Sequence, residues 1–359
     1  MKKFFLLSIC VVLLMSVCVL SAQADTKMKP VVLKVATPYP PPESSLATAH
    51  LVAWQKMVTE QTGGAVKFKN YYGGALGKPA EHLSLVKTGA VDLVVSYGWY
   101  TPKDLPLEDY DYAFPFGPTD PLILTKAMRQ IYEEFPQFRQ DMARNNIVKM
   151  FQSPGITEVF LTKEKVTSLD QLKGKRCKVI GRYFGKWLNP ISIAPVAAPG
   201  SEVYTMMQTG VIDMAMDTAD LLYAFKIIET APHVLHPELL TTNWIGTWMN
   251  MTKFNSLPKN VQDIMLEAGK KLEIMAAKEI NPAWERKIFK EWEKTPNYTF
   301  VKLSDADRAK WAESCPDTPA EWAADVTAAG YPGWEIAKRY QEITTQMGHK
   351  WVRQWAVKK

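Results

Sequence analysis

The stretch KTGAVDLVVS, at residues 87–96, has the same layout as the stretch QTGVIDMAMD at residues 208–217. Each follows an amphipathic helical segment, places a glycine where a helix ends in the left-handed conformation, and continues into apolar residues typical of a buried strand. Two such helix-to-strand units predict two similar α/β lobes. The same layout is frequent in unrelated α/β proteins, so chance resemblance stays open as the alternative.

The last residues of the two units are the first candidates for a site. In open α/β sheets, small ligands bind outside the carboxyl ends of the strands. Ser96 ends the first unit and Asp217 ends the second. We therefore expect Ser96 and Asp217 to face one another across a cleft between the lobes.

Strand-like and helix-like segments alternate around the first unit. The hydrophobic pattern predicts a strand at 33–36, a helix at 46–62, a strand at 66–72 and a helix at 78–88. This alternation favours a mainly parallel sheet that is covered on both faces.

Two strand-like segments, 147–162 and 241–252, are predicted to cross between the lobes. A single helix is expected before the first crossing, at 121–145. A long helix is expected after the second, at 259–294, with a kink at Pro282 because proline cannot donate a backbone hydrogen bond. The predicted fold is α/β and bilobal, with two mainly parallel-sheet lobes joined by crossing strands and a long kinked helix.

The domain boundaries follow from these crossings. We expect lobe I at residues 25–152 together with 241–258, and lobe II at residues 153–240. Residues 259–359 are expected to form the long helix and C-terminal helices that pack across both lobes.

The first 24 residues have the pattern of a cleaved export signal. Lys2 and Lys3 precede an apolar run at 4–20, and residues 22–24 are Ala-Gln-Ala, which a signal peptidase accepts before its cleavage point. We expect cleavage after Ala24 and export to the periplasm. A retained membrane anchor is the alternative, because the run is near the shortest length that spans a bilayer.

Charge and cysteine content say little about partners. Loss of the two signal lysines lowers the formal net charge from +6 to +4, an excess too small and too scattered to indicate nucleic-acid binding. Cys177 and Cys315 remain after cleavage, and their spacing neither requires nor forbids a disulfide.

Several segments, in order along the chain, resemble the DctP-type solute-binding proteins of tripartite ATP-independent periplasmic (TRAP) transporters. They are the glycines at 63–64 and 77 before a helix, DQLKGKRCKV at 170–179, GSEVY at 200–204, QTG at 208–210 with Asp213, and FNSLP at 254–258. The resemblance implies a periplasmic-binding-protein fold that closes around a small organic anion. It also implies delivery of that ligand to the small and large membrane subunits of a TRAP permease, driven by an ion gradient. No cofactor is expected, and we expect a monomer.

In this family an arginine on the strand after the Asp-Leu-Lys-Gly segment clamps the ligand carboxylate. Counting from Gly174, Lys178 takes that place here, and a lysine offers a point contact where the planar arginine fork offers two parallel bonds. Strand alternation puts Arg176 on the same face as Lys178, so Arg176 is a candidate to share the clamp. Arg182, just past Gly181, is a second candidate. Solvated surface charge is the alternative for all three basic residues.

The family usually has an asparagine where this chain has Asp217. An ionised carboxylate cannot donate a hydrogen bond and repels a second anionic group. Asp217 is therefore expected either to orient Lys178 or to bind a hydroxyl or ammonium group of the ligand; a helix N-cap is the structural alternative. The expected ligand is a small carboxylate or sulfonate that carries a hydroxyl, keto or amino group.

Aromatic residues are candidates for the walls of the site. Tyr97 and Trp99 follow the first unit, Tyr39 lies in the proline-rich segment 37–45, and Trp244 lies on the second crossing. Their rings combine an apolar face with a polar group, which suits a closed site for a small ligand. Ordinary core packing is the alternative for each.

An enzyme is the main competing class, and the sequence does not support it. His233 and His236 are the only close histidine pair, and no acidic or cysteine residue stands at a metal-ligand spacing from them. No nucleophile elbow, phosphate loop or dinucleotide fingerprint occurs, and no metal site is expected. A secreted hydrolase is disfavoured. A sensor domain for signalling, which shares the fold, stays open as an alternative.

Overall fold

The computed structural model describes residues 29–357, apart from the side chains of Trp99 and of residues 242–245. The predicted signal peptide and its cleavage point lie outside the described residues. Across the described part of the chain, none of the helices has the length and apolar character that crossing a membrane requires.

One branched sheet organises the molecule, with the strand order β2-β1-β3-β9-β4-β7-β5-β6. Strand β8 pairs with β4 and β10 beside this path. The strands are β1 (Val31–Ala36), β2 (Val66–Tyr71), β3 (Leu93–Ser96), β4 (Ile147–Thr162), β5 (Arg176–Val179), β6 (Ala194–Ala197), β7 (Met214–Thr218), β8 (His233–His236), β9 (Thr241–Asn250) and β10 (Thr299–Lys302). Strands β1, β2 and β3 are parallel, and we call the part around them lobe I. Strands β5, β6 and β7 are also parallel, and we call the part around them lobe II.

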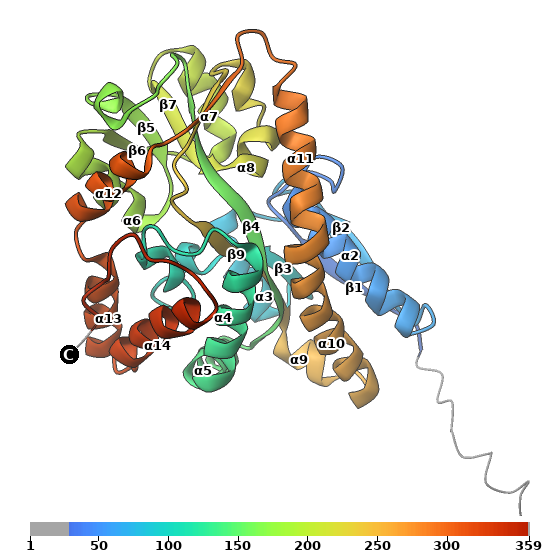
Figure 1. Ribbon diagram of the computed structural model, residues 1–359. Coiled ribbons are helices and arrows are strands. Elements are labelled where there is room, and N and C mark those ends of the chain that lie inside the picture. Colours follow the sequence, from blue (N-terminus) through green and yellow to red (C-terminus); the bar gives the residue numbers. More distant parts are fainter. Residues whose placement is uncertain (1–28, 358–359) are drawn as a thin grey trace, which may run out of the picture.

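Strands β4 and β9 are the predicted crossings, and they lie at the centre of the sheet (Figure 1). Strands β4 and β9 run antiparallel to each other, β9 runs antiparallel to β3, and β4 runs antiparallel to β7. The parallel order therefore holds within the lobes and changes at the crossings. The pairing of β4 with β9 shifts register on both sides of Pro154. Because proline has no amide hydrogen, it interrupts the ladder where the strand passes from one lobe to the other.

Helices cover both faces of this sheet. They are α2 (Leu46–Gln61), α3 (His82–Thr88), α4 (Pro121–Glu134), α5 (Gln137–Arg144), α6 (Gly181–Leu188), α7 (Gly200–Gln208), α8 (Ala219–Ala224), α9 (Met251–Asn255), α10 (Lys259–Met275), α11 (Asn281–Trp292), α12 (Asp305–Ser314), α13 (Thr318–Ala328) and α14 (Gly333–Gln346). Six 3₁₀ turns are also present among the described residues: η1 (Pro79–Glu81), η2 (Gly98–Tyr100), η3 (Asp111–Ala113), η4 (Leu169–Leu172), η5 (Asn189–Ile191) and η6 (Ile227–Glu229). The single helix predicted at 121–145 is wrong. Pro136 divides it, and Phe135 takes the extended conformation that residues before proline prefer.

Both helix-to-strand units form as the sequence predicts. Gly89 ends α3 with φ 77° and β3 follows, while Gly210 comes just after α7 with φ 72° and β7 follows. Glycine adopts this left-handed conformation without the steric cost that other residues meet. The units therefore place the ends of β3 and β7 in corresponding positions of the two lobes.

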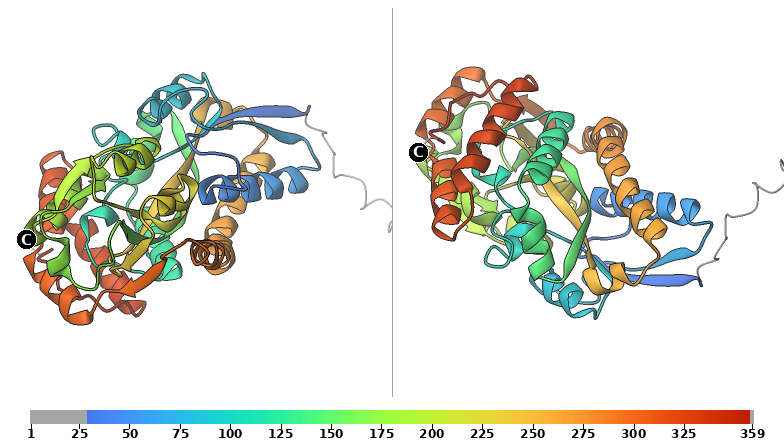
Figure 2. Two further views of the ribbon diagram at one scale, coloured as in Figure 1. Left: turned by 90° about the horizontal axis from the view of Figure 1, so that it is seen from above. Right: turned by 90° about the horizontal axis from the view of Figure 1, so that it is seen from below.

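The long helix consists of α10, a π-helical turn η7 (Ala276–Ile280) and α11. The π turn ends two residues before Pro282, whose missing amide hydrogen breaks the regular bonding pattern. Helix α10 packs on α2 and β4, and α11 packs on α8 and β4. Figures 1 and 2 show this helix running along one side of the molecule from lobe I to lobe II.

The C-terminal helices α12, α13 and α14 gather at the end of the molecule away from β1 and β2 (Figure 2). Helix α14 packs on α4 of lobe I. On the lobe II side, the indole of Trp187 donates to Thr318 Oγ1 at 2.9 Å, and the indole of Trp311 donates to the Trp187 carbonyl at 2.8 Å. These helices thus contact both lobes, while the domain boundaries at 152 and 240 stay predictions.

The two cysteines of the described chain are free and buried, Cys177 in β5 and Cys315 after α12. Burial raises the pKa of the Cys315 thiol to about 12 and raises that of Cys177 further. Neither thiol has the exposure or the lowered pKa of a reactive cysteine.

Candidate ligand-binding site

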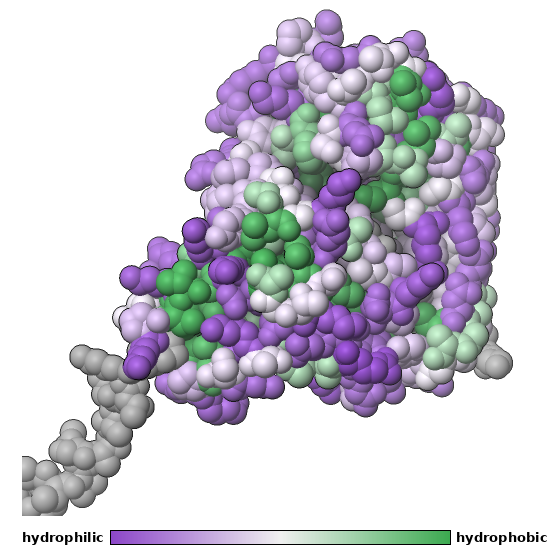
Figure 3. Space-filling view, turned by 180° about the vertical axis from the view of Figure 1, so that it is seen from behind, coloured by the Kyte–Doolittle hydropathy of each residue, from purple (hydrophilic) through white to green (hydrophobic). Residues whose placement is uncertain are grey.

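A cavity of about 490 Å³ lies between the two lobes. Its lobe I wall comes from the segments that follow β1, β2 and β3, and its lobe II wall comes from β4, the segments that follow β5 and β6, the end of β7, and α8. The lining residues are Pro38, Tyr39, Pro40, Gly73, Gly74, Gly77, Lys78, Pro79, Tyr100, Tyr112, Glu158, Ile180, Phe184, Pro199, Gly200, Ser201, Asp217, Thr218, Leu221, Ala224 and Phe225. The parallel strands of both lobes thus meet at their carboxyl ends, the usual place for a ligand in α/β sheets. Figure 3 shows hydrophobic residues gathered around the hollow between the lobes on an otherwise mostly hydrophilic surface.

Tyr39 is held at the cavity by its own loop and by the loop after β2. The amide of Tyr39 donates to Thr37 Oγ1 at 3.2 Å, and the amide of Gly73 donates to the Tyr39 carbonyl at 2.8 Å. Gly73 and Gly74 both have positive φ, which lets the second loop turn tightly against the first. The prolines on either side of Tyr39 restrict its backbone further. The backbone of Tyr39 is therefore held in place at the cavity.

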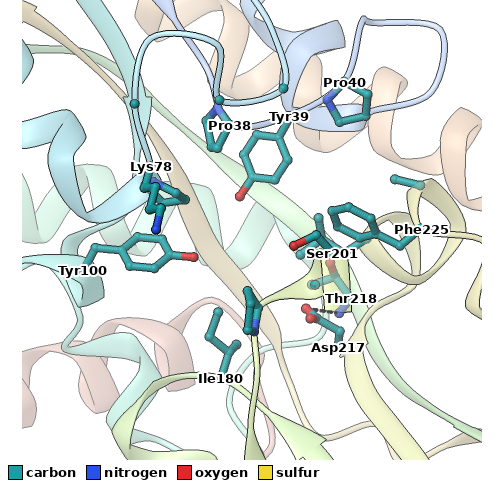
Figure 4. A pocket seen from close by; sticks show the side chains of 18 of the residues that line it. Pro38, Tyr39, Pro40, Lys78, Tyr100, Ile180, Ser201, Asp217, Thr218 and Phe225 are labelled. Atoms are coloured by element: carbon teal, nitrogen blue, oxygen red, sulfur yellow. Dashed lines mark hydrogen bonds between the residues drawn. The ribbon is translucent and has the colours of Figure 1, made fainter. Parts of the chain in front are cut away.

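Tyr97 supports Tyr39 and does not itself line the cavity. The two rings meet edge to face with centroids 5.9 Å apart, and Tyr97 also contacts the ring of Tyr100 at 5.8 Å. Tyr97 is buried, whereas Tyr39 and Tyr100 reach the cavity surface. Figure 4 shows the hydroxyl groups of Tyr39 and Tyr100 pointing into the space between the lobes.

Lys178 and Asp217 form a buried ion pair at the lobe II wall. Lys178 Nζ donates to Asp217 Oδ2, and the amide of Thr218 donates to Asp217 Oδ1 at 2.9 Å. Strands β5 and β7 are parallel neighbours, which brings these two side chains together. Asp217 lines the cavity, whereas Lys178 is 1% exposed and lies behind it. Of the two expected roles of Asp217, the pairing with Lys178 is therefore present.

Two further carboxyl groups, Glu158 and Asp220, surround this pair. Glu158 lies on β4 beside the residue that pairs with Asp217, and Asp220 lies in the first turn of α8. Burial raises the pKa of Glu158, and repulsion from Asp217 raises it more. Burial likewise raises the pKa of Asp220 to about 7. Burial and the nearby Tyr100, Asp217 and Asp220 also raise the pKa of Tyr39, so its hydroxyl stays protonated.

The structure does not bring Arg176 or Arg182 to the cavity. Arg176 is at the amino end of β5, where its guanidinium binds Asp213 with two bonds of 3.0 and 2.8 Å. Arg182 Nε lies 3.6 Å from Asp109 Oδ2, and the guanidinium covers the ring of Tyr183. Both guanidinium groups thus have partners elsewhere.

Ser96 and Asp217 do not face one another, contrary to the expectation from the two units. Ser96 is buried in the ladder between β3 and β9, opposite Gly246, and does not line the cavity. Strand β9 pairs with β3 as far as Ser96, which the sequence pattern could not indicate. The side chains of Trp99 and Trp244 lie outside the described part of the structure.

The lining residues with polar side chains that the sequence reasoning missed include Lys78, Glu158 and Ser201. Lys78 and Ser201 lie in the segments that come after β2 and β6, so the rule that ligands bind at carboxyl ends of strands points to those segments. Glu158 lies inside the crossing strand β4 and had no such signal.

Comparison with known proteins shows the family to which this chain belongs. The model of the DctP family, described as bacterial extracellular solute-binding protein family 7, matches residues 39–324. The chain belongs to the DctP family. A solute-binding protein of Sulfitobacter sp. (strain NAS-14.1) is 27% identical to this DctP-family chain in an alignment 257 residues long that covers 69% of this chain and 73% of that protein.

Solved structures confirm the predicted fold of this DctP-family protein. The TRAP periplasmic solute-binding protein of Desulfovibrio salexigens, an open complex, has a TM-score of 0.76 and 21% identity, covering 89% of this chain and 97% of that chain. DctP7 of Bordetella pertussis, an extracytoplasmic solute receptor binding pyroglutamic acid, has a TM-score of 0.74 and 18% identity, covering 87% and 99%. The family match makes this chain a bacterial extracellular solute-binding protein of family 7, and it shares its fold with a TRAP periplasmic solute-binding protein. Among the described residues, no group of three or more His, Cys, Asp or Glu is placed to hold a metal ion.

Proposed function

We propose that this protein captures a small organic acid in the cavity between its lobes and delivers it to the membrane subunits of a TRAP transporter. The observation that carries the proposal is the position of the cavity, which takes walls from both lobes at the carboxyl ends of their strands. Closure of the lobes would bury a ligand held there. Uptake would then be driven by an ion gradient, with the receptor acting as a monomer.

The cavity suits a small, partly apolar ligand with several polar groups. Its volume of about 490 Å³ is within the range of small-molecule sites. Rings of Tyr39, Tyr100 and Phe225 provide apolar walls, and hydroxyl and carboxyl groups provide the polar contacts. A receptor of this fold from Bordetella pertussis binds pyroglutamic acid, which supports a small acid as the ligand here.

The site residues have different roles in this proposal. Tyr39 and Asp217 line the cavity and would contact the ligand, while Lys178 and Tyr97 hold them in place. Trp99 and Trp244 stay candidate wall residues. Arg176, Arg182 and Ser96 do not line the cavity, so we assign them no ligand contact.

Native mass spectrometry followed by small-angle X-ray scattering tests the proposal. The protein purified from an exported preparation is expected to carry an acid of low mass, and the intact mass checks cleavage after Ala24. Adding that acid to ligand-free protein should lower the radius of gyration and raise stability by about 2.7 kcal/mol at a hundredfold excess over Kd. Binding without compaction would contradict lobe closure, and failure of every small acid to bind would contradict the function.

A further inference from the structure

The charged groups around the cavity are unequally divided between the lobes. Among the described lining residues, Lys78 is the cationic side chain and belongs to lobe I, while Glu158 and Asp217 are the acidic ones and belong to lobe II. The net charge of the whole chain is positive, so this acidic wall is a local feature.

Lys178 neutralises only part of the lobe II wall. Its ammonium group is committed to Asp217, behind the cavity surface. Glu158 is 3% exposed and makes no ion pair within residues 29–357. Asp220 is 1% exposed, and its carboxyl group makes no ion pair among the described residues. Three buried carboxyl groups therefore share one buried lysine.

Such a wall disfavours a ligand that brings only negative charge. A buried carboxylate without a partner is costly, because burial removes the water that would solvate it. A ligand anion placed beside Asp217 would add repulsion, and lobe closure would increase it by excluding water. A cationic nitrogen in the same position would supply the missing counter-charge. Three aromatic rings, those of Tyr39, Tyr100 and Phe225, also line the cavity, and an aromatic ring can attract a nearby cation.

Lys78 is placed to bind the other end of the ligand. Lys78 comes after Gly77 and immediately before the 3₁₀ turn η1. Figure 4 shows its side chain beside Tyr100, across the cavity from Asp217. Lys78 is exposed and forms no ion pair in the described part of the chain, so its ammonium group is available to an anion. A carboxylate there would lie on the lobe I side and away from the acidic wall.

Resting on the proposed function, we propose that the ligand is a zwitterion: an organic acid that also carries a cationic nitrogen. The nitrogen contacts Asp217 and Glu158 of lobe II, and the carboxylate contacts Lys78 of lobe I. Because the two charges of the ligand contact different lobes, binding itself pulls the lobes together. Lys178 does not contact the ligand and acts as a positioning residue for Asp217.

Titration calorimetry on matched pairs of compounds tests the ligand class. Three pairs differ in the nitrogen and keep the carboxylate: L-proline with tetrahydrofuran-2-carboxylate, L-phenylalanine with 3-phenyllactate, and glycine betaine with 3,3-dimethylbutyrate. In a pair that binds, the nitrogen compound should bind about tenfold tighter or more. Tighter binding by the nitrogen-free partner overturns the inference. So does a co-purified acid without a basic nitrogen, although it would still support the proposed function.

Two variants with matched controls locate the contacts. Glu158→Gln replaces the carboxyl group, which a cationic nitrogen beside it would help to ionise, by an amide of nearly the same volume, and it should reduce the preference for the nitrogen compound by about tenfold. Glu164→Gln, an exposed carboxylate that pairs with Lys175, should not change it. Lys78→Gln should weaken both members of a pair equally, because both carry the carboxylate, while the exposed Lys103→Gln should weaken neither. An unchanged preference in Glu158→Gln overturns the assignment of the nitrogen to the acidic wall.

Discussion

His50 Nε2 lies 2.8 Å from Asn281 Oδ1, and this contact joins α2 of lobe I to the first residue of α11. The amide of Asn281 donates to the carbonyls of Pro154 and Gly155 at 2.9 and 2.7 Å, which fixes its oxygen toward the imidazole. Nε2 of His50 therefore carries the proton, and Nδ1 accepts from the Ser153 hydroxyl at 2.9 Å. The network links α2, the long helix and the point where β4 passes between the lobes.

Protonation of His50 should destabilise the protein in mildly acidic solution. Burial lowers the pKa of His50 from 6.5 to about 4. His50 therefore binds a proton near pH 6.5 in the unfolded chain but only near pH 4 in the folded chain. The contribution of His50 to the unfolding free energy is fully present above pH 6.5 and is lost as the pH falls toward 4. His50 contributes up to about 1.4 kcal/mol per pH unit to the slope of the unfolding free energy against pH.

Chemical denaturation of wild type and His50→Gln between pH 4 and 8 measures this slope. The variant should be less stable at pH 8, because its amide cannot satisfy both neighbours in the same geometry, and its stability should fall less steeply below pH 6.5. His82 and His349 also have lowered pKa values in the folded chain, and they remain in both proteins. Parallel curves would show that His50 contributes no proton linkage.

Close packing of α10 on β4 depends on Gly269. A methyl group at Gly269 would lie 2.0 Å from the Met150 carbonyl oxygen, so the helix would have to move away from the strand. Gly269→Ala should lower the unfolding free energy by about 1–3 kcal/mol. In Gly185→Ala, within α6, the new methyl meets only Pro195 at 3.4 Å, so this control should be neutral or slightly stabilising. Thermal unfolding of wild type and both variants measures the difference. A Gly269→Ala protein with the melting temperature of wild type would contradict the close approach of α10 to β4.

Local backbone chemistry is what the sequence predicted best. The left-handed Gly89 and Gly210 and the interruption near Pro282 each depend on one residue type, and all three are confirmed. Pro136 carried an equally clear signal, but the hydrophobic pattern on both sides of it led to the prediction of one helix.

The site was predicted less well because its two walls belong to different lobes. Asp217 ends a strand, so its place at the cavity followed from local order. Arg176 shares a strand face with Lys178 but lies roughly 7 Å nearer the amino end, away from the edge where the cavity forms. Glu158 lies inside β4 and reaches the cavity only through the tertiary arrangement of that strand. Strand periodicity carries no information about that arrangement.

Removal of Lys178 should destabilise the folded protein more than it changes any direct ligand contact. Lys178→Met leaves Asp217 buried beside Glu158 and Asp220 without a counter-charge, which should cost about 3–5 kcal/mol of unfolding free energy. The double variant Lys178→Met with Asp217→Asn should recover much of this loss. Thermal and chemical unfolding measure both effects.

Arg176→Met is the control for this experiment. Its partner Asp213 is on the outside of lobe II, so the melting temperature should change little. A Lys178→Met protein as stable as wild type would contradict the buried ion pair.

Asp217→Asn separates a ligand-binding role from a purely structural one. If Asp217 contacts a cationic nitrogen or a hydroxyl of the ligand, the amide should weaken that ligand by about 1–3 kcal/mol. The same change should improve the binding of simple dicarboxylates, because an amide can donate to a carboxylate that the ionised side chain repels. Titration calorimetry with a panel of dicarboxylates, hydroxy acids, amino acids and sulfonates measures the ranking of ligands. Asp213→Asn is the matched control, since Asp213 belongs to the same helix-to-strand unit but pairs with Arg176 outside the cavity. A ranking that is the same in wild type, Asp217→Asn and Asp213→Asn would leave Asp217 only its structural role beside Lys178.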